Sequence, residues 1–308
     1  MDAKTTGTTV IAVGNQKGGV GKTTTTVNLA AALGTLGKRS LVIDLDANCG
    51  ATHCFKIPPD SYQGSYELLL GEEDDPLALA LETDPDEGIS LPLGVSMIPG
   101  SRDLENAERA LMGKHRMDNY RTCLREPIRK IRESGRFDFV FLDTAPNIMA
   151  PTASAYWAAD WFILTATPER LAIEGMNDAM SDIRTMQEQS NPNLKLLGVA
   201  LVSVHNRTKV ASEITGWVED AFSGLNQYGV FDTRISRATA VPNGQVEGKT
   251  IFEFAPTHKV AEEFRQLARE VLTRIDSDPT AAVGGSASPV EAGSEVQPKP
   301  DEGVTAHA

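Results

Sequence analysis

Residues 14–29 read GNQKGGVGKTTTTVNL and follow the apolar stretch TVIAV at 9–13. The segment contains two lysines, Lys17 and Lys22, although a phosphate-binding loop normally needs only one. A strand, a glycine-rich turn and a helix start, in this order, let backbone N–H groups and the positive end of a helix surround a phosphate. The segment therefore predicts a phosphate-binding loop.

The spacing within this segment assigns a role to several residues. Lys22 and Thr23 directly follow Gly21, so Lys22 is expected to bridge the β- and γ-phosphates while the Thr23 hydroxyl binds Mg²⁺. The predicted nucleotide-binding residues are Lys17, Gly18, Gly19, Val20, Gly21, Lys22, Thr23 and Thr24. The alternative is a tight strand-to-helix turn without a ligand, and Gln16 stands where the general motif has glycine.

Apolar runs alternate with amphipathic segments along the whole chain. The strand-like runs are at 9–15, 40–46, 94–100, 137–143, 161–167 and 194–204, and the helical segments are at 22–36, 102–133, 152–158, 172–189, 208–223 and 258–275. Continuous Val, Ile and Leu runs separated by helices are typical of a parallel sheet that is buried on both faces. The pattern predicts an α/β fold with a doubly wound, mainly parallel sheet and helices on both faces.

The formal charge of −13 in 308 residues is concentrated in two segments. Residues 71–90 contain eight acids and no base, and residues 277–308 contain five acids and one lysine, which leaves a charge of −1 for the rest. The last segment is rich in Gly, Ala, Ser and Pro and is expected to be disordered. We predict a flexible N-terminus at 1–8, one folded domain at 9–276 with an acidic insertion at about 71–90, and a disordered acidic tail at 277–308.

Features of export and of membrane insertion are missing from the sequence. No stretch approaches the roughly 18 apolar residues of a membrane span, and the first residues, MDAKTTGTT, lack the profile of a signal peptide. The three cysteines, Cys49, Cys54 and Cys123, form no even framework and are expected to be reduced. We therefore expect a cytoplasmic protein that does not bind membranes.

The phosphate loop also identifies a family. The stretch KGGVGKT resembles the deviant phosphate loop of the MinD/ParA superfamily, and NQKGGVGKTTTTVNLAAAL is similar to its ParA/Soj branch, in which glutamine commonly precedes the first lysine. The resemblance implies that Lys17 reaches across a two-fold axis to the nucleotide of a second subunit. Buried phosphate charge that one subunit cannot neutralise would then hold a homodimer together. The alternative is a solvated loop lysine.

Two further motifs of this family end in acidic residues. LVIDLDANCGAT at 41–52 resembles the motif D-x-D-P-Q-G-N-A-T, with Ala47–Gly50 departing from it, and FDFVFLDTAPN at 137–147 resembles the Walker B segment. The resemblance implies that Asp46 positions the attacking water, that Asp44 supports the metal shell and that Asp143 holds Mg²⁺. Cys49, His53 and Cys54 lack a fourth, well-spaced ligand, so packing is favoured there over a zinc site.

Matches to the family continue to about residue 275. TPERLAIEG at 167–175 and GKTIFEFAP at 248–256 resemble two late segments, with Glu169, Ala172, Glu174 and Gly175 in place in the first. The resemblance implies an ATP- and Mg²⁺-dependent dimerising ATPase with slow hydrolysis that a ParB-like or adaptor protein stimulates. Its expected task is the partition of chromosomes or plasmids, or the positioning of a cargo over the nucleoid.

The resemblance also implies non-specific DNA binding by the ATP-bound dimer, which would place the protein at the nucleoid. Arg237 matches the first arginine of the family segment I-P-R-N-V-R, whereas Ala240 stands at the second arginine. The other candidate cations are Arg207, Lys209, Arg265, Arg269 and Arg274. Ordinary solvated charges are the alternative at these positions.

Two other functions stay open at this point. A metabolic P-loop ligase would use the same loop to activate a small carboxylic substrate. A MinD-like membrane-positioning ATPase would end in a basic amphipathic helix, whereas this tail is acidic, and the apolar face of the last helix, at 258–275, is expected to pack on the sheet.

Overall fold

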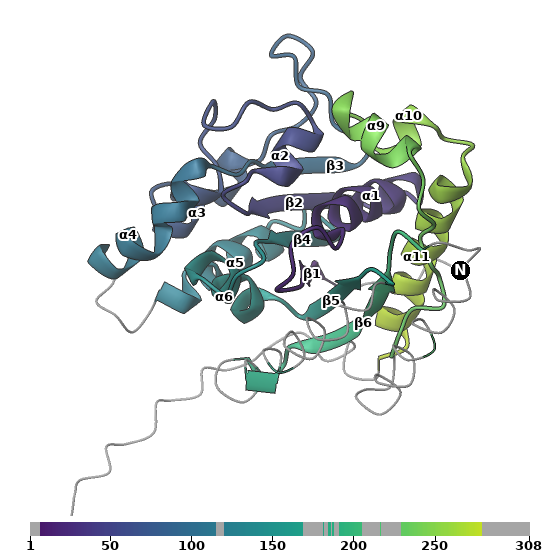
Figure 1. Ribbon diagram of the computed structural model, residues 1–308. Helices are drawn as coiled ribbons and strands as arrows, with labels where there is room; N and C mark the ends of the chain where they lie inside the picture. The colour runs from purple at the N-terminus through teal and green to yellow at the C-terminus, as the bar shows by residue number, and fades with distance from the viewer. Residues whose placement is uncertain are drawn as a thin grey trace, which may run out of the picture.

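A parallel sheet forms the centre of the protein. The computed structural model describes residues 7–114, 120–168, 191–204 and 229–278, together with the isolated helical positions 181, 184, 185, 187 and 216. Within these residues the sheet has six strands in the order β3-β2-β4-β1-β5-β6 (Figure 1). They are β1 (Thr9–Gly14), β2 (Ser40–Leu45), β3 (Val95–Ile98), β4 (Phe139–Thr144), β5 (Trp161–Ala166) and β6 (Lys195–Leu201), all paired in parallel. The predicted α/β class is confirmed.

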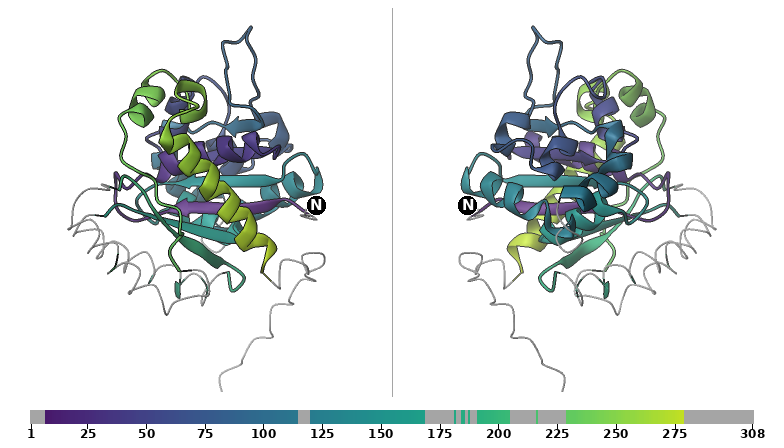
Figure 2. Two further views of the ribbon diagram at one scale, coloured as in Figure 1. Left: turned by 90° about the vertical axis from the view of Figure 1, so that its right-hand side faces the viewer. Right: turned by 90° about the vertical axis from the view of Figure 1, so that its left-hand side faces the viewer.

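Helices cover both faces of this sheet. One face carries α1 (Lys22–Thr35), α2 (Gly50–Cys54), α10 (Ile251–Phe254) and α11 (Lys259–Asp276), with α9 (Ala240–Val246) packed against α2 and α10. The other carries α3 (Ser65–Leu70), α4 (Ala107–Lys114), α5 (Arg125–Glu133) and α6 (Ala150–Ala158). The two side views in Figure 2 show α11 on one side of the sheet and α5 and α6 on the other. The sheet is therefore doubly wound.

The side chains of the strands alternate between two hydrophobic cores. In β1, Val10 and Ala12 belong to the core beneath α5 and α6, whereas Ile11 and Val13 belong to the core beneath α1 and α11. All four are completely buried. Because successive side chains of a strand point to opposite faces, a strand covered on both faces must be apolar at every position. This explains the unbroken apolar runs in the sequence.

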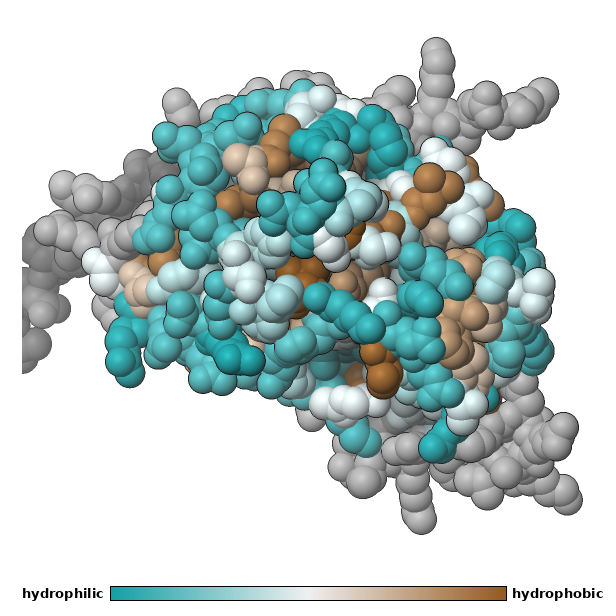
Figure 3. Space-filling view, turned by 90° about the horizontal axis from the view of Figure 1, so that it is seen from above, coloured by the Kyte–Doolittle hydropathy of each residue, from teal (hydrophilic) through white to brown (hydrophobic). Residues whose placement is uncertain are grey.

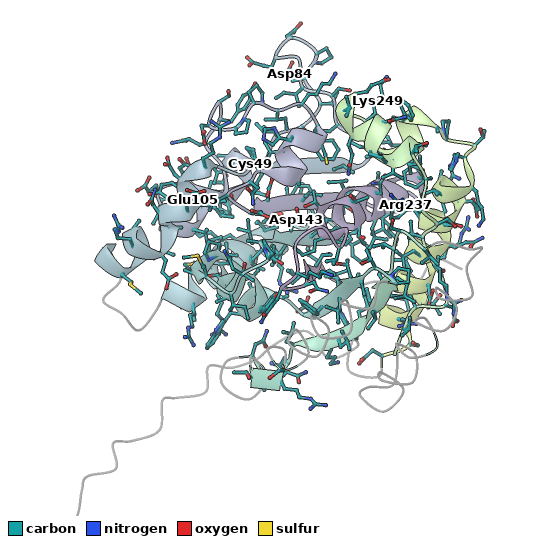
Figure 4. All side chains as sticks on the ribbon, viewed as in Figure 1. Cys49, Asp84, Glu105, Asp143, Arg237 and Lys249 are labelled. Carbon is teal, nitrogen blue, oxygen red and sulfur yellow. The ribbon has the colours of Figure 1, made fainter. Side chains whose placement is uncertain are left out.

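Both edges of the sheet are covered by chain. Leu81, in the acidic insertion, exchanges two backbone hydrogen bonds with Met97 of β3, at 2.8 and 3.0 Å. The insertion also contains a short helix, η1 (Pro76–Leu79), and a turn closed by Asp84 and Ile89. This turn projects from the molecule above β3, with Asp84 near its tip (Figures 1 and 4). The predicted acidic insertion thus protects an edge strand, which would otherwise be open to pairing.

The face seen from above in Figure 3, which includes this projection, is largely hydrophilic, and hydrophobic residues gather there only in small, separated patches. The other edge strand, β6, is bridged by Val230 at Val199, and Ser236 bridges Val204 just beyond the end of the strand. Neither edge therefore presents a bare strand within the described residues.

The predicted helix at 102–133 is broken in the structure. It consists of η2 (Arg102–Asn106), α4, η3 (Tyr120–Thr122) and α5, with residues 115–119 outside the described part. Pro127 cannot sit inside a helix but is tolerated in a first turn, and it is the third residue of α5. A new helix therefore has to begin shortly before it. The short helices α2, α3, α9 and α10 were not predicted, and the predicted helices at 172–189 and 208–223 lie largely outside the described residues.

The last helix packs on the sheet as expected. Five large apolar side chains of α11 are at most 4% exposed, namely Val260, Phe264, Leu267, Val271 and Ile275. Ser277 and Asp278, the first residues of the predicted tail, still belong to the packed body, since Asp278 is buried and forms an ion pair with Lys195 at 2.9 Å. The rest of the predicted tail lies outside the described residues. In the described part of the chain, no helix is both long and apolar enough to cross a membrane.

Candidate nucleotide-binding site

The glycine-rich segment connects β1 to α1, as the sequence predicts. Gly19 and Gly21 have φ angles of 74° and 80°, in the left-handed region that favours glycine. A Cβ at Gly21 would also lie 2.8 Å from Cγ2 of Val202. Because Gly21 is the N-cap of α1, the free N–H groups of the first helical turn lie next to the loop. The loop thus offers the backbone donors that bind an anion.

Lys22 is buried at the start of α1. Its side chain is 7% exposed, and Nζ donates a hydrogen bond to the carbonyl oxygen of Lys17 at 3.1 Å. Burial lowers the pKa of the Lys22 ammonium group, whereas the nearby carboxylates of Asp143 and Asp46 raise it. A poorly hydrated cation in an anion-binding loop is well suited to bind phosphate oxygens.

Two hydroxyl groups on one face of α1 bind the carboxylate of Asp143. Thr23 Oγ1 donates to Asp143 Oδ2 at 2.8 Å, and Thr26 Oγ1 lies 3.0 Å from Asp143 Oδ1. The predicted metal ligands Thr23 and Asp143 therefore lie together. Thr26 was missed by the sequence analysis, although its position three residues after Thr23 places it on the same helical face.

Asp44 lies beside Asp143 because β2 and β4 pair in that register. The Asp44 carboxylate is completely buried and accepts hydrogen bonds from the backbone N and Oγ1 of Thr52, at 2.9 and 2.7 Å. It also accepts one from the backbone N of Asp46 at 3.2 Å. In this structure Asp44 holds α2 and the loop after β2, so its role at the metal stays a prediction.

The two buried carboxyl groups have raised pKa values. Burial raises the pKa of Asp143 to about 8, and the charge of Asp44 adds to this while hydrogen bonds from Thr23 and Thr26 oppose it. Burial raises the pKa of Asp44 to about 6 against the hydrogen bonds from Thr52. A cation bound here would offset the cost of two neighbouring negative charges, and a hydroxyl with carboxylate oxygens is a donor set that fits Mg²⁺.

Asp46 begins the loop after β2 and is half-buried. Its Oδ1 accepts hydrogen bonds from the backbone N and Nδ2 of Asn48, both at 2.9 Å. The carboxylate lines a cavity of about 180 Å³ between the loops that follow β2 and β4. Pro146, which the Walker B resemblance singled out, and Thr152, whose Oγ1 is buried without a hydrogen-bond partner, line the same cavity. Asp46 therefore borders a cavity that has room for water molecules.

Cys49 stands where the family pattern has glycine, and its backbone is left-handed. It has φ 52° and ψ 42°, a left-handed conformation that costs a residue with a side chain about 1–2 kcal/mol. Next to it, a Cβ at Gly50 would lie only 3.1 Å from Thr23 Oγ1, so the loop packs directly on the phosphate loop. Cys49 and Cys54 are both buried.

Lys17 is half-buried in the middle of the loop. Its backbone N donates to Asn15 Oδ1 at 2.8 Å, and Asn15 Nδ2 donates to the carbonyl oxygen of Thr165 at 2.7 Å. Asn15, which the sequence analysis did not single out, thus attaches the loop to the end of β5. The predicted role of Lys17 concerns a second subunit and stays a prediction.

The predicted DNA-binding arginines have different surroundings. Arg237 is exposed on the side of the molecule near α11 (Figure 4). Arg265 and Arg269 are each paired with Glu262, at 3.2 and 3.0 Å. Arg274 is 9% exposed and donates to the backbone carbonyls of Leu197 and Val230 and to Glu270, so it is not available to DNA. Arg207, Lys209 and the family motif residues Glu169, Ala172, Glu174 and Gly175 lie outside the described residues.

The fold and the loop together define the class of P-loop nucleotide-binding proteins. The loop lies at the carboxyl end of the central strand β1, where ligands of open parallel sheets bind, and the acidic ends of β2 and β4 meet there.

Comparison with known proteins places the chain within this class. A family model described as "AAA domain" matches residues 8–196. The chromosome-partitioning ATPase Soj of Thermus thermophilus is 35% identical over 266 residues, which cover 86% of this chain and 96% of Soj. The chain therefore belongs to the ParA/Soj family of P-loop ATPases.

Solved structures show the same fold. Cobyrinic acid a,c-diamide synthase of Mycobacterium smegmatis, with bound ATP analogue and magnesium, has a TM-score of 0.72 and 30% identity, and the match covers 88% of this chain and 96% of that one. The septum site-determining protein MinD of Pyrococcus horikoshii, with Mg-ADP, has a TM-score of 0.65 at 23% identity over 88% of this chain and 99% of that one. At that identity the second likeness concerns the fold alone.

Proposed function

We propose that this chain is a slow ATPase that works as a switch, dimerising when ATP and Mg²⁺ are bound and separating after hydrolysis. The observation that carries the proposal is the hydrogen bond of 2.8 Å between Thr23 and Asp143 directly behind the glycine loop. It brings together the hydroxyl, the carboxylate and the backbone donors that an Mg²⁺-bound triphosphate requires. Partition of a chromosome is the task that the similarity to the chromosome-partitioning ATPase Soj suggests, and we extend the proposal to a plasmid or another cargo.

Each residue of the site has a separate part in this reaction. Lys22 and the amides after Gly21 bind and orient the phosphates. Asp46 orients the attacking water and keeps it from positions that do not lead to reaction. Thr23 and Asp143 would hold Mg²⁺, which neutralises phosphate charge when bound. Phosphoryl transfer to water depends mainly on such positioning and charge neutralisation, so no covalent role for the chain is needed.

In the dimer, each subunit would supply a second cation to the nucleotide of the other subunit. Lys22 already directs its ammonium group into the loop, where Nζ donates to the carbonyl oxygen of Lys17, so the half-buried Lys17 would be the second cation, for the phosphates of a partner subunit. Lys17→Ala should then abolish ATP-dependent dimerisation while leaving ADP binding within about twofold of wild type. Sedimentation with ATP, with ADP and without nucleotide tests this, with Lys38→Ala as the control, because Lys38 is half-buried like Lys17 but lies beyond the other end of α1. A Lys17→Ala protein that still dimerises with ATP contradicts the proposal.

We further propose that a ParB-like or adaptor protein stimulates hydrolysis and that the dimer binds DNA without sequence preference, which would place it at the nucleoid. Arg237 is an exposed candidate for phosphate contact, and Arg265 and Arg269, which are paired with Glu262, are two further candidates. DNA binding that requires ATP and weakens steeply with salt supports this part of the proposal. DNA binding that is indifferent to nucleotide contradicts it.

A metabolic ligase is the second candidate because the diamide synthase relative is 30% identical over most of both chains. A ligase would consume ATP only when a carboxylic acid substrate is present, whereas a switch hydrolyses ATP slowly without one. Phosphate release in the absence and presence of carboxylic acids separates the two. The MinD-like alternative needs a free amphipathic helix, and the apolar face of α11 is buried against the sheet.

A further inference from the structure

Helix α9 is attached to the first turn of α1 by one side chain. Gln245 Nε2 donates a hydrogen bond to Thr24 Oγ1 at 3.0 Å, although the two residues are 221 positions apart in the sequence. Thr24 directly follows Thr23, whose hydroxyl binds Asp143. A second contact, from the backbone N of Ile251 to Asn28 Oδ1 at 2.9 Å, attaches α10 to the same helix. Hydrogen bonds from a segment that is distant in the sequence therefore hold α1 in place.

The direction of the first hydrogen bond determines what the Thr24 hydroxyl can do. A hydroxyl has one hydrogen to donate and two lone pairs, whereas the nitrogen of a glutamine amide only donates. Thr24 must therefore accept from Gln245, and its own hydrogen remains available for another acceptor. Thr24 lies in the first turn of α1, next to the free backbone N–H groups that bind phosphate.

Gln245 is itself held from two sides. It belongs to α9, whose Gly244 packs so closely that a Cβ there would lie 2.9 Å from the carbonyl oxygen of Lys249. Its side chain also lies near Cys54 in α2, the helix that follows the Asp46 loop: burial raises the pKa of the Cys54 thiol, and hydrogen bonding by Gln245 opposes this. A glutamine amide has two hydrogens and one oxygen, so it can make both contacts at once.

We propose that Gln245 is a positioning residue of the phosphate site, which presents the Thr24 hydroxyl as a donor to the phosphates and links nucleotide binding to the placement of α9. The inference rests on the proposed nucleotide binding. By reciprocity, a nucleotide that favours this hydrogen bond also favours the docked position of α9. α9 begins three residues after the exposed Arg237, so the linkage extends to the surface proposed for DNA.

A double-mutant cycle with Thr24 tests this role. Binding of ADP with Mg²⁺ is measured by titration calorimetry for wild type, Gln245→Ala, Thr24→Val and the double variant. Gln245→Ala should weaken ADP binding about fivefold, the size of one hydrogen bond, and should add less than about twofold once the Thr24 hydroxyl is gone. Gln245→Glu should weaken binding more than Gln245→Ala. A carboxylate would accept a hydrogen bond from the Thr24 hydroxyl, which then could not donate to phosphate, and its charge would repel the phosphates.

Matched variants separate positioning from packing. Val246→Ala alters the neighbouring residue of α9, which is 79% exposed, and Cys54→Ala removes the other partner of Gln245; both should bind ADP within about twofold of wild type. Melting temperatures without nucleotide report any purely structural effect.

Two results overturn the inference. One is a Gln245→Ala protein with a lowered melting temperature and unchanged ADP affinity. The other is an equal loss of affinity with and without the Thr24 hydroxyl. A wild-type protein that fails to bind ADP overturns the proposed function as well, so the two failures are distinguishable.

Discussion

Replacing Asp143 by asparagine should make the protein more stable at pH 8. Asp143 is completely buried, and burial together with the charge of Asp44 raises its pKa from 3.8 to about 8. The folded protein therefore retains a proton that the unfolded chain releases near pH 4. The stabilisation that this retained proton gives the folded state is fully present below pH 3.8 and is lost as the pH rises through about 8. Asparagine stays neutral at every pH and removes this loss.

The structure sets the size of the effect. Each pKa unit corresponds to about 1.4 kcal/mol, so a rise from 3.8 to about 8 allows at most about 6 kcal/mol. Water that enters the site on ionisation lowers this, and we expect a gain of about 2 kcal/mol at pH 8. The amide of asparagine can still pair with the hydroxyls of Thr23 and Thr26, so no buried polar group is left without a partner.

Urea unfolding between pH 5 and pH 8, with EDTA and without nucleotide, measures this. The stability of the wild type should fall with pH more steeply than that of Asp143→Asn. Asp138→Asn is the matched control with the opposite sign. Burial raises the pKa of Asp138, but the hydrogen bonds from Arg39 lower it by more, so the net pKa is below the usual value. This variant should therefore lose stability at pH 8. An Asp143→Asn protein that is less stable than wild type at pH 8 would refute the reasoning.

Three other changes have clear expected outcomes. Asp46→Ala should slow ATP hydrolysis about 100-fold and prolong the ATP-bound dimer, as measured by phosphate release and sedimentation; hydrolysis at the wild-type rate would remove Asp46 from the reaction. Arg237→Glu should weaken ATP-dependent DNA binding and reduce the slope of log affinity against log salt by about one, and an unchanged slope would assign the phosphate contacts elsewhere. Gly34→Ala should destabilise the protein in urea by about 1–3 kcal/mol, because a Cβ there would lie 1.9 Å from the carbonyl oxygen of Leu93, whereas a more stable variant would mean that the backbone yields easily.

The phosphate loop could be predicted from the sequence because its requirements are local. Glycines at 19 and 21 permit left-handed backbone, and Lys22 and Thr23 follow at a spacing that only a loop-to-helix turn uses. The predicted helix at 22–36 was observed as Lys22–Thr35, and the predicted strand at 40–46 as Ser40–Leu45. Apolar periodicity identified the doubly wound sheet for the same reason, since it reports directly which faces of a segment are buried.

The surroundings of the site depended on contacts between distant segments. The register of β2 against β4 places Asp44 beside Asp143, Thr52 holds Asp44 from a helix that had no sequence signal, and Gln245 arrives from 221 residues beyond Thr24. Gly34 shows the difference most directly, since local helix propensity favours alanine there while the carbonyl of Leu93 excludes it. Backbone preference and periodicity are properties of neighbouring residues, and the sequence alone determines them. Which side chains meet across the sheet is decided by close packing of the whole chain, and only the tertiary structure shows it.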